Sequence, residues 1–493
     1  MNFFLNKGMG HSNSGVENAQ FYRLEAFDSI GQPAKLILSD LLPKLHEHMQ
    51  EWQLEETNVL NLYDYLMAAE PARYLDRGML RKELVRYDQT TLSDFTKTNR
   101  LVIEQATSGY LIKRMKEKVW SERKQLFLVS DAQVELSRGD RTLSWSFRHV
   151  DGRREMTAIM LTNFLGQNYY FENFYDLLSF FLADLKKHFG KSNYFLDRGL
   201  DYDEYLVANR DRFAMDQLIA VVHADHRFSV YHGKKTRLVF NQFYQYLANH
   251  LSFYDQVVVS TTQQQKTLQR NLKDLGYDKK ERDKVRAIPV GFVRSRASKT
   301  VISTKDDSRP LKLVTASRLH PEKHIDQLIL AAGALKRKGV AFDFSIYGTG
   351  QEEERLKQLI EEQGLSGTVT LAGFCQDLPD VLKKADLYLS ASYSEGFGLT
   401  YLEALAQGVP VVSYKNIYGA AELVQDGKSG FLVDFRPDKA AIADNVEAMV
   451  GAILQAKKQL ASLSTGALKR AADFSKASVS TDWQRLLEEA HEV

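Results

Sequence analysis

The segment Ser394–Ala404 places two carboxylates around a pair of glycines. Glu395 lies just before Gly396 and Gly398, and Glu403 follows with seven residues between the two glutamates. Carboxylates repel phosphate, so their natural partners in a ligand are hydroxyl groups. We therefore expect Glu395 to accept a hydrogen bond from a sugar and Glu403 to accept one from a ribose. Together these contacts describe a sugar nucleotide.

The residues on either side of these glycines have the patterns of a strand and a helix. The apolar run Leu387–Ser390 is typical of a buried strand, and Leu399–Gln407 has the amphipathic spacing of a helix. Backbone N–H groups at such a helix start attract anions, because they are unpaired and because the peptide dipoles sum to positive charge there. The turn therefore predicts a diphosphate site in which Phe397, Gly398 and Leu399 approach the donor.

A second junction between a strand and a helix supplies positive charge. The strand Leu311–Ala316 is followed by Arg318 and Lys323, and then by a helix whose apolar residues begin at Ile325. Side chains at the carboxyl ends of parallel strands line ligand sites in open α/β sheets. Arg binds phosphate oxygens through its planar fork and Lys adds a mobile point charge. We predict that both hold the donor diphosphate; the alternative is a solvated pair of charges that caps a helix.

The start of the chain predicts another wall of the site. The first strand leads into a glycine-containing loop that ends with Ser14 as the N-cap of a helix and with Gly15, which lets the backbone approach a ligand. The glycine spacing differs from that of a dinucleotide fingerprint. The turn at Gly348-Thr349-Gly350 also fails this test, because Glu353 stands where a third glycine is needed. A nicotinamide enzyme is therefore disfavoured.

Two histidines follow the buried-type strand Leu218–Val222. A histidine at the carboxyl end of a parallel strand points into the ligand cleft, where it can hydrogen-bond a sugar hydroxyl. We predict that His223 orients the reacting groups and that His226 and Asp197 lie on the acceptor side.

A metal site is the alternative for these polar residues. His223 and His226 flank an aspartate, and Asp201 and Asp203 imitate the metal-binding carboxylate pair of GT-A transferases. No third cluster of metal ligands is evident in the sequence. We therefore favour a site without a metal.

Composition describes an ordinary soluble globular protein. The 493 residues include 26% charged and 11% aromatic side chains, and the formal net charge is +2, which predicts no nucleic-acid partner. The single cysteine, Cys375, excludes an internal disulfide framework and suits a reducing compartment. No apolar run is long enough for a signal peptide or a membrane span. We expect a cytoplasmic protein, with peripheral contact to the inner face of the membrane left open.

The chain alternates strand and helix patterns except in one β-rich stretch. There, short strand candidates are separated by the hairpin turns Ser108-Gly109, Arg138-Gly139-Asp140, Asp151-Gly152 and Leu165-Gly166. This pattern predicts an antiparallel meander inserted into the first α/β domain. The strand candidates are Leu101–Ala106, Tyr110–Met115, Gln125–Val129, Gln133–Leu136, Leu143–Val150, Glu155–Leu161 and Gln167–Phe171.

The pattern predicts four parts. Residues 1–50 and 190–298 form an acceptor-side Rossmann-like domain, and 51–189 form the insertion, which we expect to bind an oligomer partner or the acceptor. Residues 299–475 form the nucleotide-sugar-binding Rossmann-like domain. Residues 476–493 form a terminal helix.

The segment around Glu395 and Glu403 resembles the glutamate signature of retaining GT-B glycosyltransferases of glycosyltransferase family 4. Arg318 and Lys323 match the cationic pair that holds the donor diphosphate in that family. The resemblance implies a GT-B fold, a retaining UDP-sugar-dependent hexosyltransferase, and no cofactor or metal. It also implies that the helix at residues 476–493 crosses back to the first domain. By this analogy, uracil lies near Phe374. No enzymatic nucleophile is obvious, so electrostatic stabilisation of the leaving diphosphate is the expected mechanism.

Further segments, including Ser14–Gln20, Val221–His226 and Ile288–Gly291, resemble glycosyltransferases of the serine-rich-repeat adhesins exported by the accessory Sec system. This implies transfer from UDP-GlcNAc or UDP-Glc to Ser or Thr of the adhesin, or to the first O-linked sugar. It also implies a homo-oligomer or a heteromer with a related subunit. Wall teichoic acid glycosyltransferases carry a similar insertion and remain an alternative. A non-catalytic partner subunit is a further alternative, but such subunits tend to lose the four charged residues that this chain keeps.

Overall fold

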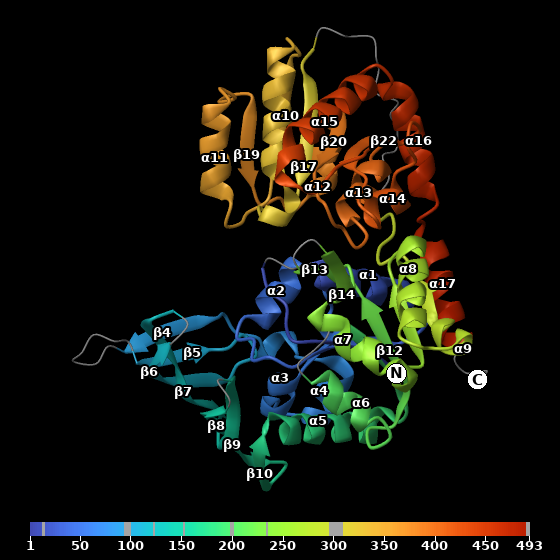
Figure 1. Ribbon diagram of the computed structural model, residues 1–493. Helices are drawn as coiled ribbons and strands as arrows, with labels where there is room; N and C mark the ends of the chain where they lie inside the picture. Colours follow the sequence, from blue (N-terminus) through green and yellow to red (C-terminus); the bar gives the residue numbers. More distant parts are fainter. Residues whose placement is uncertain are drawn as a thin grey trace. The chain divides into compact units, whose positions relative to one another are not determined.

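The computed structural model of the chain describes residues 1–11, 15–92, 100–121, 124–150, 153–197, 202–232, 235–294 and 309–489. The chain divides into two compact units. Unit 1 comprises Met1–Val221 and Asn249–Gln256, and unit 2 comprises Val222–Ala248 and Val257–Val493. The sheets are parallel apart from an antiparallel one in unit 1 and a small hairpin in unit 2, which confirms the predicted α/β class with an inserted meander (Figure 1).

The parallel sheet of unit 1 has the order β12-β11-β1-β2-β3. Its central strand β1 is wholly buried, and the ring of Phe4 lies 5.1 Å from the rings of both Phe27 and Phe195. Because the strands are parallel, their carboxyl ends open at one edge, where ligands bind in such sheets. The strands are β1 (Asn2–Asn6), β2 (Ala34–Leu38), β3 (Val59–Asn61), β11 (Ser192–Asp197) and β12 (Met215–Val222).

Helices connect these strands. The longest of them, α5, begins with an N-cap at Asn173 and buries its apolar face. The helices of this unit are α1 (Gly15–Ser29), α2 (Leu45–Glu51), α3 (Leu62–Met67), α4 (Pro71–Arg77), α5 (Phe174–Phe189) and α6 (Asp203–Ala208).

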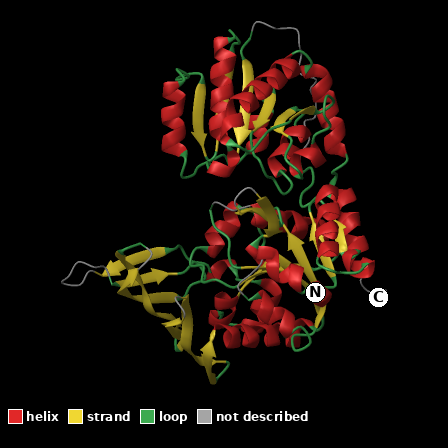
Figure 2. Ribbon diagram, in the orientation of Figure 1, coloured by secondary structure: helices red, strands yellow, loops and turns green. Residues whose placement is uncertain are grey.

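The insertion is a seven-stranded antiparallel meander in which each strand pairs with the next. Figure 2 shows it as an all-strand body beside the helix-covered parallel sheet of the same unit. Leu143, Trp145 and Ile159 are buried on its covered face. The strands are β4 (Asp88–Leu92), β5 (Leu101–Gln105), β6 (Leu111–Ser121), β7 (Leu126–Arg138), β8 (Arg141–Val150), β9 (Arg153–Phe164) and β10 (Gln167–Asn173).

Two details of the predicted meander are wrong. The candidates Gln125–Val129 and Gln133–Leu136 form one strand, β7, because pairing with β6 continues through the polar residues between them. The strand β4 was not predicted, since its sequence Asp-Gln-Thr-Thr-Leu is fully exposed and lacks an apolar alternation. Both errors arise where backbone pairing, and not burial, holds the strand.

A buried histidine joins the insertion to the parallel sheet. The Nδ1 atom of His46 lies 2.8 Å from Glu56 Oε1, and its Nε2 atom lies 3.1 Å from Asp64 Oδ2. Asp64 also accepts hydrogen bonds from Ser108 Oγ at 2.6 Å and Tyr110 OH at 3.1 Å, both in the turn between β5 and β6. Burial by itself lowers the pKa of His46, but the two carboxylates outweigh it and raise the pKa to about 9. The network therefore contains a charged imidazolium at neutral pH.

This network predicts that stability falls with rising pH. The folded-state pKa of His46, about 9, exceeds its ordinary value of 6.5. The stabilisation is therefore complete below about pH 6.5 and is lost as the pH rises through 9, at up to about 1.4 kcal/mol per pH unit. Thermal melts of the wild type and of His46→Gln between pH 6 and 10 measure it. The difference in melting temperature between the two proteins should shrink as the pH rises. A difference that stays constant would contradict the prediction.

The carboxyl-terminal part of unit 2 contains a six-stranded parallel sheet with the order β19-β18-β17-β20-β21-β22. The first three strands extend to one side and the last three to the other, so the order reverses between β17 and β20. Loops that follow strands at such a switch point diverge and leave a crevice for ligands. The strands are β17 (Leu311–Ala316), β18 (Phe342–Tyr347), β19 (Val369–Gly373), β20 (Leu387–Ser390), β21 (Val411–Tyr414) and β22 (Gly430–Val433).

Both faces of this sheet are covered. Leu313 and Val412 belong to one buried cluster, whereas their neighbours Val314 and Val411 belong to another. Alternate residues thus point to opposite faces, each packed against helices. The helices are α10 (Ile325–Arg337), α11 (Glu353–Glu362), α12 (Leu378–Leu382), α13 (Leu399–Ala406), α14 (Gly419–Leu423), α15 (Ile442–Lys457), α16 (Leu460–Ala472) and α17 (Lys476–Glu489).

The remaining elements of unit 2 precede this sheet in the sequence. Strands β13 and β14 form an antiparallel hairpin, and β15 pairs with β16 in parallel. The terminal helix α17 contacts this region, where Arg286 Nη2 lies 2.7 Å from Glu489 Oε2. Within the described residues, no helix is both long and apolar enough to cross a membrane. The elements are β13 (Arg227–His232), β14 (Lys235–Phe240), α7 (Gln242–Asn249), β15 (Gln256–Val259), α8 (Thr262–Asp274), α9 (Lys279–Arg282) and β16 (Val285–Ala287).

Candidate functional site

The loop after β17 carries both predicted cationic residues. Arg318 is 66% exposed, and its guanidinium donates to Glu322 Oε1 at 2.8 Å. Lys323 ends a short 3₁₀ turn, Pro321–Lys323, and its side chain is mostly buried. The exposed Arg318–Glu322 pair contributes little to stability, so the guanidinium can exchange this carboxylate for a ligand phosphate.

The loops after β17 and β20 meet at the switch point. Lys323 Nζ donates to Glu395 Oε1 at 2.6 Å, although 72 residues separate the two in the sequence. Gly398 then caps α13 in the left-handed conformation with φ of 90°, a conformation that glycine adopts without strain. Phe397 is buried beside it, and Leu399 begins the helix. An ammonium group, a carboxylate and a helix start thus lie together, and their predicted roles toward the donor stay predictions.

The second glutamate has a perturbed pKa. Glu403 lies on α13 and is only partly exposed. Burial raises its pKa from 4.5 to about 7, against an opposing effect from the charge of Arg294. A carboxylate kept in such a place costs stability, which is common where a side chain serves a ligand.

Removal of the Glu403 charge should stabilise the free protein at alkaline pH. Because the folded-state pKa of about 7 lies above the ordinary 4.5, stability at this site is present below about pH 4.5 and is lost as the pH rises through 7. The free energy of unfolding of Glu403→Gln should therefore exceed that of the wild type by on the order of 1–2 kcal/mol at pH 8.5 and match it near pH 5. Denaturant titrations at the two pH values test this. UDP affinity should fall in the same variant, and a gain in stability at both pH values would contradict the assignment to ionisation.

The backbone after β12 touches the loop of Glu395. A Cβ atom added to Gly396 would lie 2.1 Å from the carbonyl oxygen of His223. The backbone at His223 and Ala224 is itself fixed, because both N–H groups donate to Tyr244 OH, at 3.1 and 3.3 Å. Gln264 Nε2 donates to the Ala224 carbonyl at 2.7 Å. The backbone of His223 thus packs on the Glu395 loop, and the predicted role of its side chain stays a prediction.

Tyr418 supports the same loop and was not predicted. Its hydroxyl donates to Asp225 Oδ1 at 3.2 Å and accepts from Arg227 Nη2 at 3.0 Å. The next residue, Gly419, donates its N–H to the Glu395 carbonyl at 3.1 Å. No motif in the sequence marks this arrangement. Gly419 suits it, because a Cβ added there would lie 2.3 Å from the Phe397 carbonyl oxygen.

The Gly348-Thr349-Gly350 turn has a structural role beside Arg318. A Cβ added to Gly348 would lie 1.8 Å from the Ser317 carbonyl oxygen, and one added to Gly350 would lie 2.3 Å from that of Leu319. The glycines therefore allow two backbones to pack directly together. This explains glycines that do not belong to a dinucleotide fingerprint.

The predicted residues outside the switch point have separate environments. Gly15 is exposed at the start of α1, and Ser14 lies outside the described residues. Asp197 is buried at the end of β11, where it accepts hydrogen bonds from Arg23 and from Gln20, the latter at 2.9 Å. These roles stay predictions.

His226 and Phe374 also differ in exposure. His226 is fully buried and lies 3.0 Å from Asn271 Oδ1, and burial lowers its pKa to about 4. Phe374 follows β19 and is 44% exposed, as a base-stacking ring requires. Their predicted contacts with the acceptor and with uracil are untested.

The described ranges contain no group of three or more His, Cys, Asp or Glu residues that could hold a metal ion. Asp201, one of the two aspartates of the GT-A-like pair, lies outside these ranges. Asp203 begins α6 and is buried. Metal independence stays a prediction.

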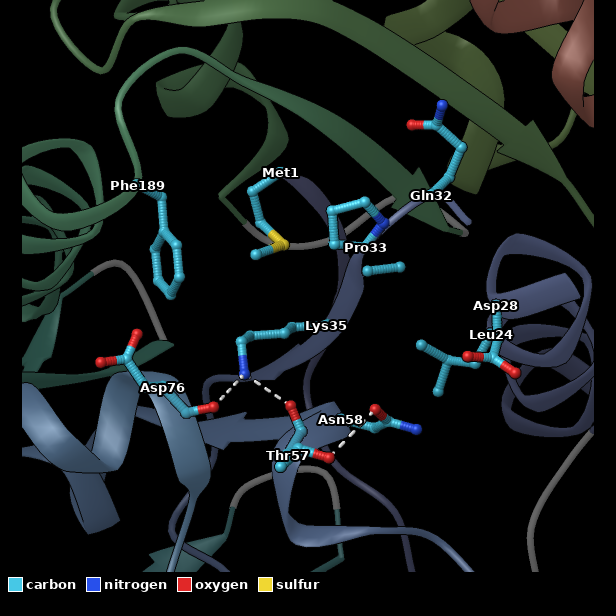
Figure 3. A pocket seen from close by; sticks show the side chains of 11 residues that line it. Met1, Leu24, Asp28, Gln32, Pro33, Lys35, Thr57, Asn58, Asp76 and Phe189 are labelled. Atoms are coloured by element: carbon cyan, nitrogen blue, oxygen red, sulfur yellow. Dashed lines mark hydrogen bonds between the residues drawn. The ribbon is translucent and has the colours of Figure 1, made fainter. Parts of the chain in front are cut away.

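A hollow of about 260 Å³ lies at the opposite, amino-terminal edge of the unit 1 sheet (Figure 3). Lys35 Nζ is directed at the carbonyl oxygens of Thr57, at 2.5 Å, and Asp76, at 3.1 Å. Burial lowers the pKa of Lys35 to about 8. The lysine ties two backbone segments together below the sheet, so the hollow is separate from the carboxyl edge where the candidate residues lie.

Known proteins resemble the chain in sequence and in structure. Residues 299–458 match the family Glycosyl transferases group 1. The chain is 27% identical to the UDP-N-acetylglucosamine--peptide N-acetylglucosaminyltransferase GtfA subunit of Streptococcus gordonii, over 99% of this chain and 98% of that protein.

Two solved structures share its fold. The pneumococcal O-GlcNAc transferase GtfA, in complex with UDP and GlcNAc, has a TM-score of 0.72 and 22% identity and covers 100% of this chain and 99% of its own. TarM has a TM-score of 0.69 and 18% identity over 98% of both chains. The chain therefore has the GT-B fold of these proteins and carries a glycosyl transferases group 1 domain.

Proposed function

We propose that this glycosyltransferase moves N-acetylglucosamine or glucose from a UDP-sugar to a bacterial serine-rich-repeat adhesin, with retention of configuration and without a metal ion. The observation that carries this proposal is the 2.6 Å contact between Lys323 and Glu395 at the switch point, beside the start of α13. The similarity to the GtfA subunit over nearly the whole chain supports the choice of donor and acceptor.

Different site residues bind different parts of the donor. Arg318 and Lys323 neutralise the diphosphate, and the start of α13 adds N–H groups and a favourable dipole. Glu395 accepts hydrogen bonds from the sugar, and Glu403 accepts them from the ribose. The ring of Phe374 stacks on uracil.

The reaction exchanges one bond to the anomeric carbon. The acceptor hydroxyl oxygen forms a bond to this carbon on the face that the leaving group occupies. The bond to the β-phosphate oxygen breaks, and its electron pair stays on UDP. The hydroxyl proton passes to the same phosphate oxygen. Cationic side chains that strengthen their contacts as this charge develops lower the barrier.

Product analysis tests the proposal. The protein is incubated with UDP-GlcNAc or UDP-Glc and, separately, with a serine-rich adhesin polypeptide, the same polypeptide carrying O-linked sugar, and a teichoic acid. Mass spectrometry identifies the modified acceptor, NMR identifies the anomer, and EDTA tests the need for metal. Transfer only to teichoic acid would show that the proposed acceptor is wrong. Inversion of configuration, or activity that EDTA removes and manganese restores, would show that the proposed mechanism is wrong.

The insertion supplies a surface for a partner chain. Leu126, Phe127 and Val129 of β7 are all exposed, and Phe127 is 63% exposed. Since successive strand residues point to opposite faces, both faces here are apolar. Within the described residues, strand β7 pairs with β8 only over Gln133–Arg138, so its first half presents an open edge there. The name of the relative as a subunit supports an assembly, and we propose this edge as its surface.

Charge at this edge should disrupt the assembly. Phe127→Glu should lower the molar mass measured by light scattering, because it buries a charge against an apolar partner surface. Transfer to long acceptors should fall several-fold with it, since an assembly raises the effective acceptor concentration. Tyr170→Glu, at a position 62% exposed on β10 at the far edge, is the control. A wild type that is monomeric both alone and with its partner would overturn this prediction.

A further inference from the structure

A second, smaller pocket lies at the carboxyl edge of the unit 1 sheet. Its volume is about 220 Å³, and it is enclosed by the loops after β1 and β2, by Met156 of the insertion, and by the start of α5. We name it the aromatic pocket after four of its residues. It is defined by Tyr63, Phe174, Tyr175, Tyr202, Asp40 and Lys7.

Contacts behind the walls hold the aromatic pocket open. Tyr202 OH donates to Ser39 Oγ at 3.0 Å, and the ring of Phe174 lies 6.1 Å from that of Tyr202. The carbonyl of Asp40 accepts from Asn61 Nδ2 at 2.8 Å. The pocket is therefore formed before a ligand arrives, which lowers the entropic cost of binding.

The hydroxyl of Tyr63 is the feature that calls for a ligand. The residue is only 3% exposed, its ring lies 5.6 Å from that of Trp145, and it lines the pocket. Its hydroxyl makes no hydrogen bond to another residue in the part of the chain that the structure describes. Burial, and then the charge of Asp40, raise the pKa of Tyr63, so the group stays neutral. A neutral phenol can both donate and accept, and at the pocket wall this one keeps both capacities for a ligand.

The lining selects for a neutral ring with hydroxyl groups. The volume of about 220 Å³ lies below the range of roughly 300–1,000 Å³ that holds drug-sized ligands, so a nucleotide sugar does not fit. Asp40 and Lys7 carry opposite charges, so together they favour a ligand without net charge. Aromatic faces contact the C–H face of a pyranose, while Tyr63, Asp40 and Lys7 can bond its hydroxyls. Few polypeptide side chains offer both an apolar face and a ring of hydroxyls.

We propose that the aromatic pocket binds one pyranose ring of an acceptor polypeptide that already carries sugar. The inference rests on the proposed function and extends it. A polypeptide with many serines would be held by a sugar already attached while a neighbouring residue reaches the donor. The enzyme then favours a partly glycosylated acceptor over an unmodified one.

Binding of methyl N-acetyl-α-glucosaminide to the full-length protein tests the pocket without transfer. Saturation-transfer NMR is recorded with saturating UDP for the wild type, Tyr63→Phe, Phe174→Ala and Glu395→Gln. The dissociation constant of the glycoside should rise about five- to tenfold in Tyr63→Phe, since one hydrogen bond is lost. It should rise at least as much in Phe174→Ala. Glu395→Gln should bind the glycoside as the wild type does, which separates the pocket from the donor site. Tyr170→Phe is the matched control and should be unaffected.

Acceptor kinetics give the second measurement. Tyr63→Phe should raise the KM for a glycosylated serine-rich polypeptide about five- to tenfold while UDP affinity is kept. Equal KM values for wild type and Tyr63→Phe, with UDP still bound, would overturn the inference and leave the proposed function intact. A protein that binds no UDP would instead overturn the proposed function. If an unmodified peptide depends on Tyr63 and the glycoside does not, the pocket binds polypeptide and the sugar assignment is wrong.

Discussion

Glu395→Gln should reduce transfer by about 10²–10³-fold while the protein stays folded and retains UDP. The carboxylate is 20% exposed and lies 2.6 Å from Lys323 Nζ. A sugar hydroxyl that bonds this carboxylate gains most as positive charge develops at the reacting carbon. A neutral amide of the same shape keeps the packing and loses this gain. The expected loss lies in kcat, with little change in UDP affinity, because Lys323 keeps its charge for the diphosphate.

Steady-state kinetics with each UDP-sugar, together with UDP titration calorimetry, check this result. Glu354→Gln, at an exposed position on α11, is the matched control and should behave as the wild type. Near-normal turnover in Glu395→Gln would remove Glu395 from the mechanism. A parallel loss of UDP binding would instead indicate that Glu395 holds the loop together and does not act on the sugar.

Gly396→Ala should also abolish most activity, through geometry and not through charge. The new Cβ would lie 2.1 Å from the His223 carbonyl oxygen and 3.0 Å from its carbon. Both atoms belong to backbone that Tyr244 and Gln264 fix, so the loop of Glu395 has to move instead. A displacement of about 1 Å at a catalytic group can cost roughly 10²-fold in rate. We expect a loss of at least that size in kcat/KM.

Gly451→Ala provides the control for this substitution. Gly451 lies within α15 with no atom near an added Cβ, so alanine should leave activity unchanged and stabilise the helix by about 0.5–1 kcal/mol. Circular dichroism and UDP binding show whether Gly396→Ala is folded. Full activity in that variant would mean that the contact between the two segments does not form during the reaction.

The sequence alone was sufficient where neighbouring residues form the feature. Glu395, Gly398 and the start of α13 lie close together in the sequence, so local patterns were enough to predict the strand, the glycine turn and the helix. The short strand candidates and the hairpin turns between them predicted the meander in the same local way. The patterns failed at β4 and in the middle of β7, where no burial pattern exists.

Tertiary structure decided which distant residues meet. The contact between Lys323 and Glu395 depends on β17 and β20 being neighbours at the point where the strand order reverses, which no local pattern encodes. Tyr418, which no motif marked, bonds Asp225 and Arg227, and its neighbour Gly419 donates to the Glu395 carbonyl. The aromatic pocket joins loops from opposite ends of unit 1 in the same way. Spacing along the chain fixes local geometry, whereas sheet order and backbone packing fix the contacts that complete a site.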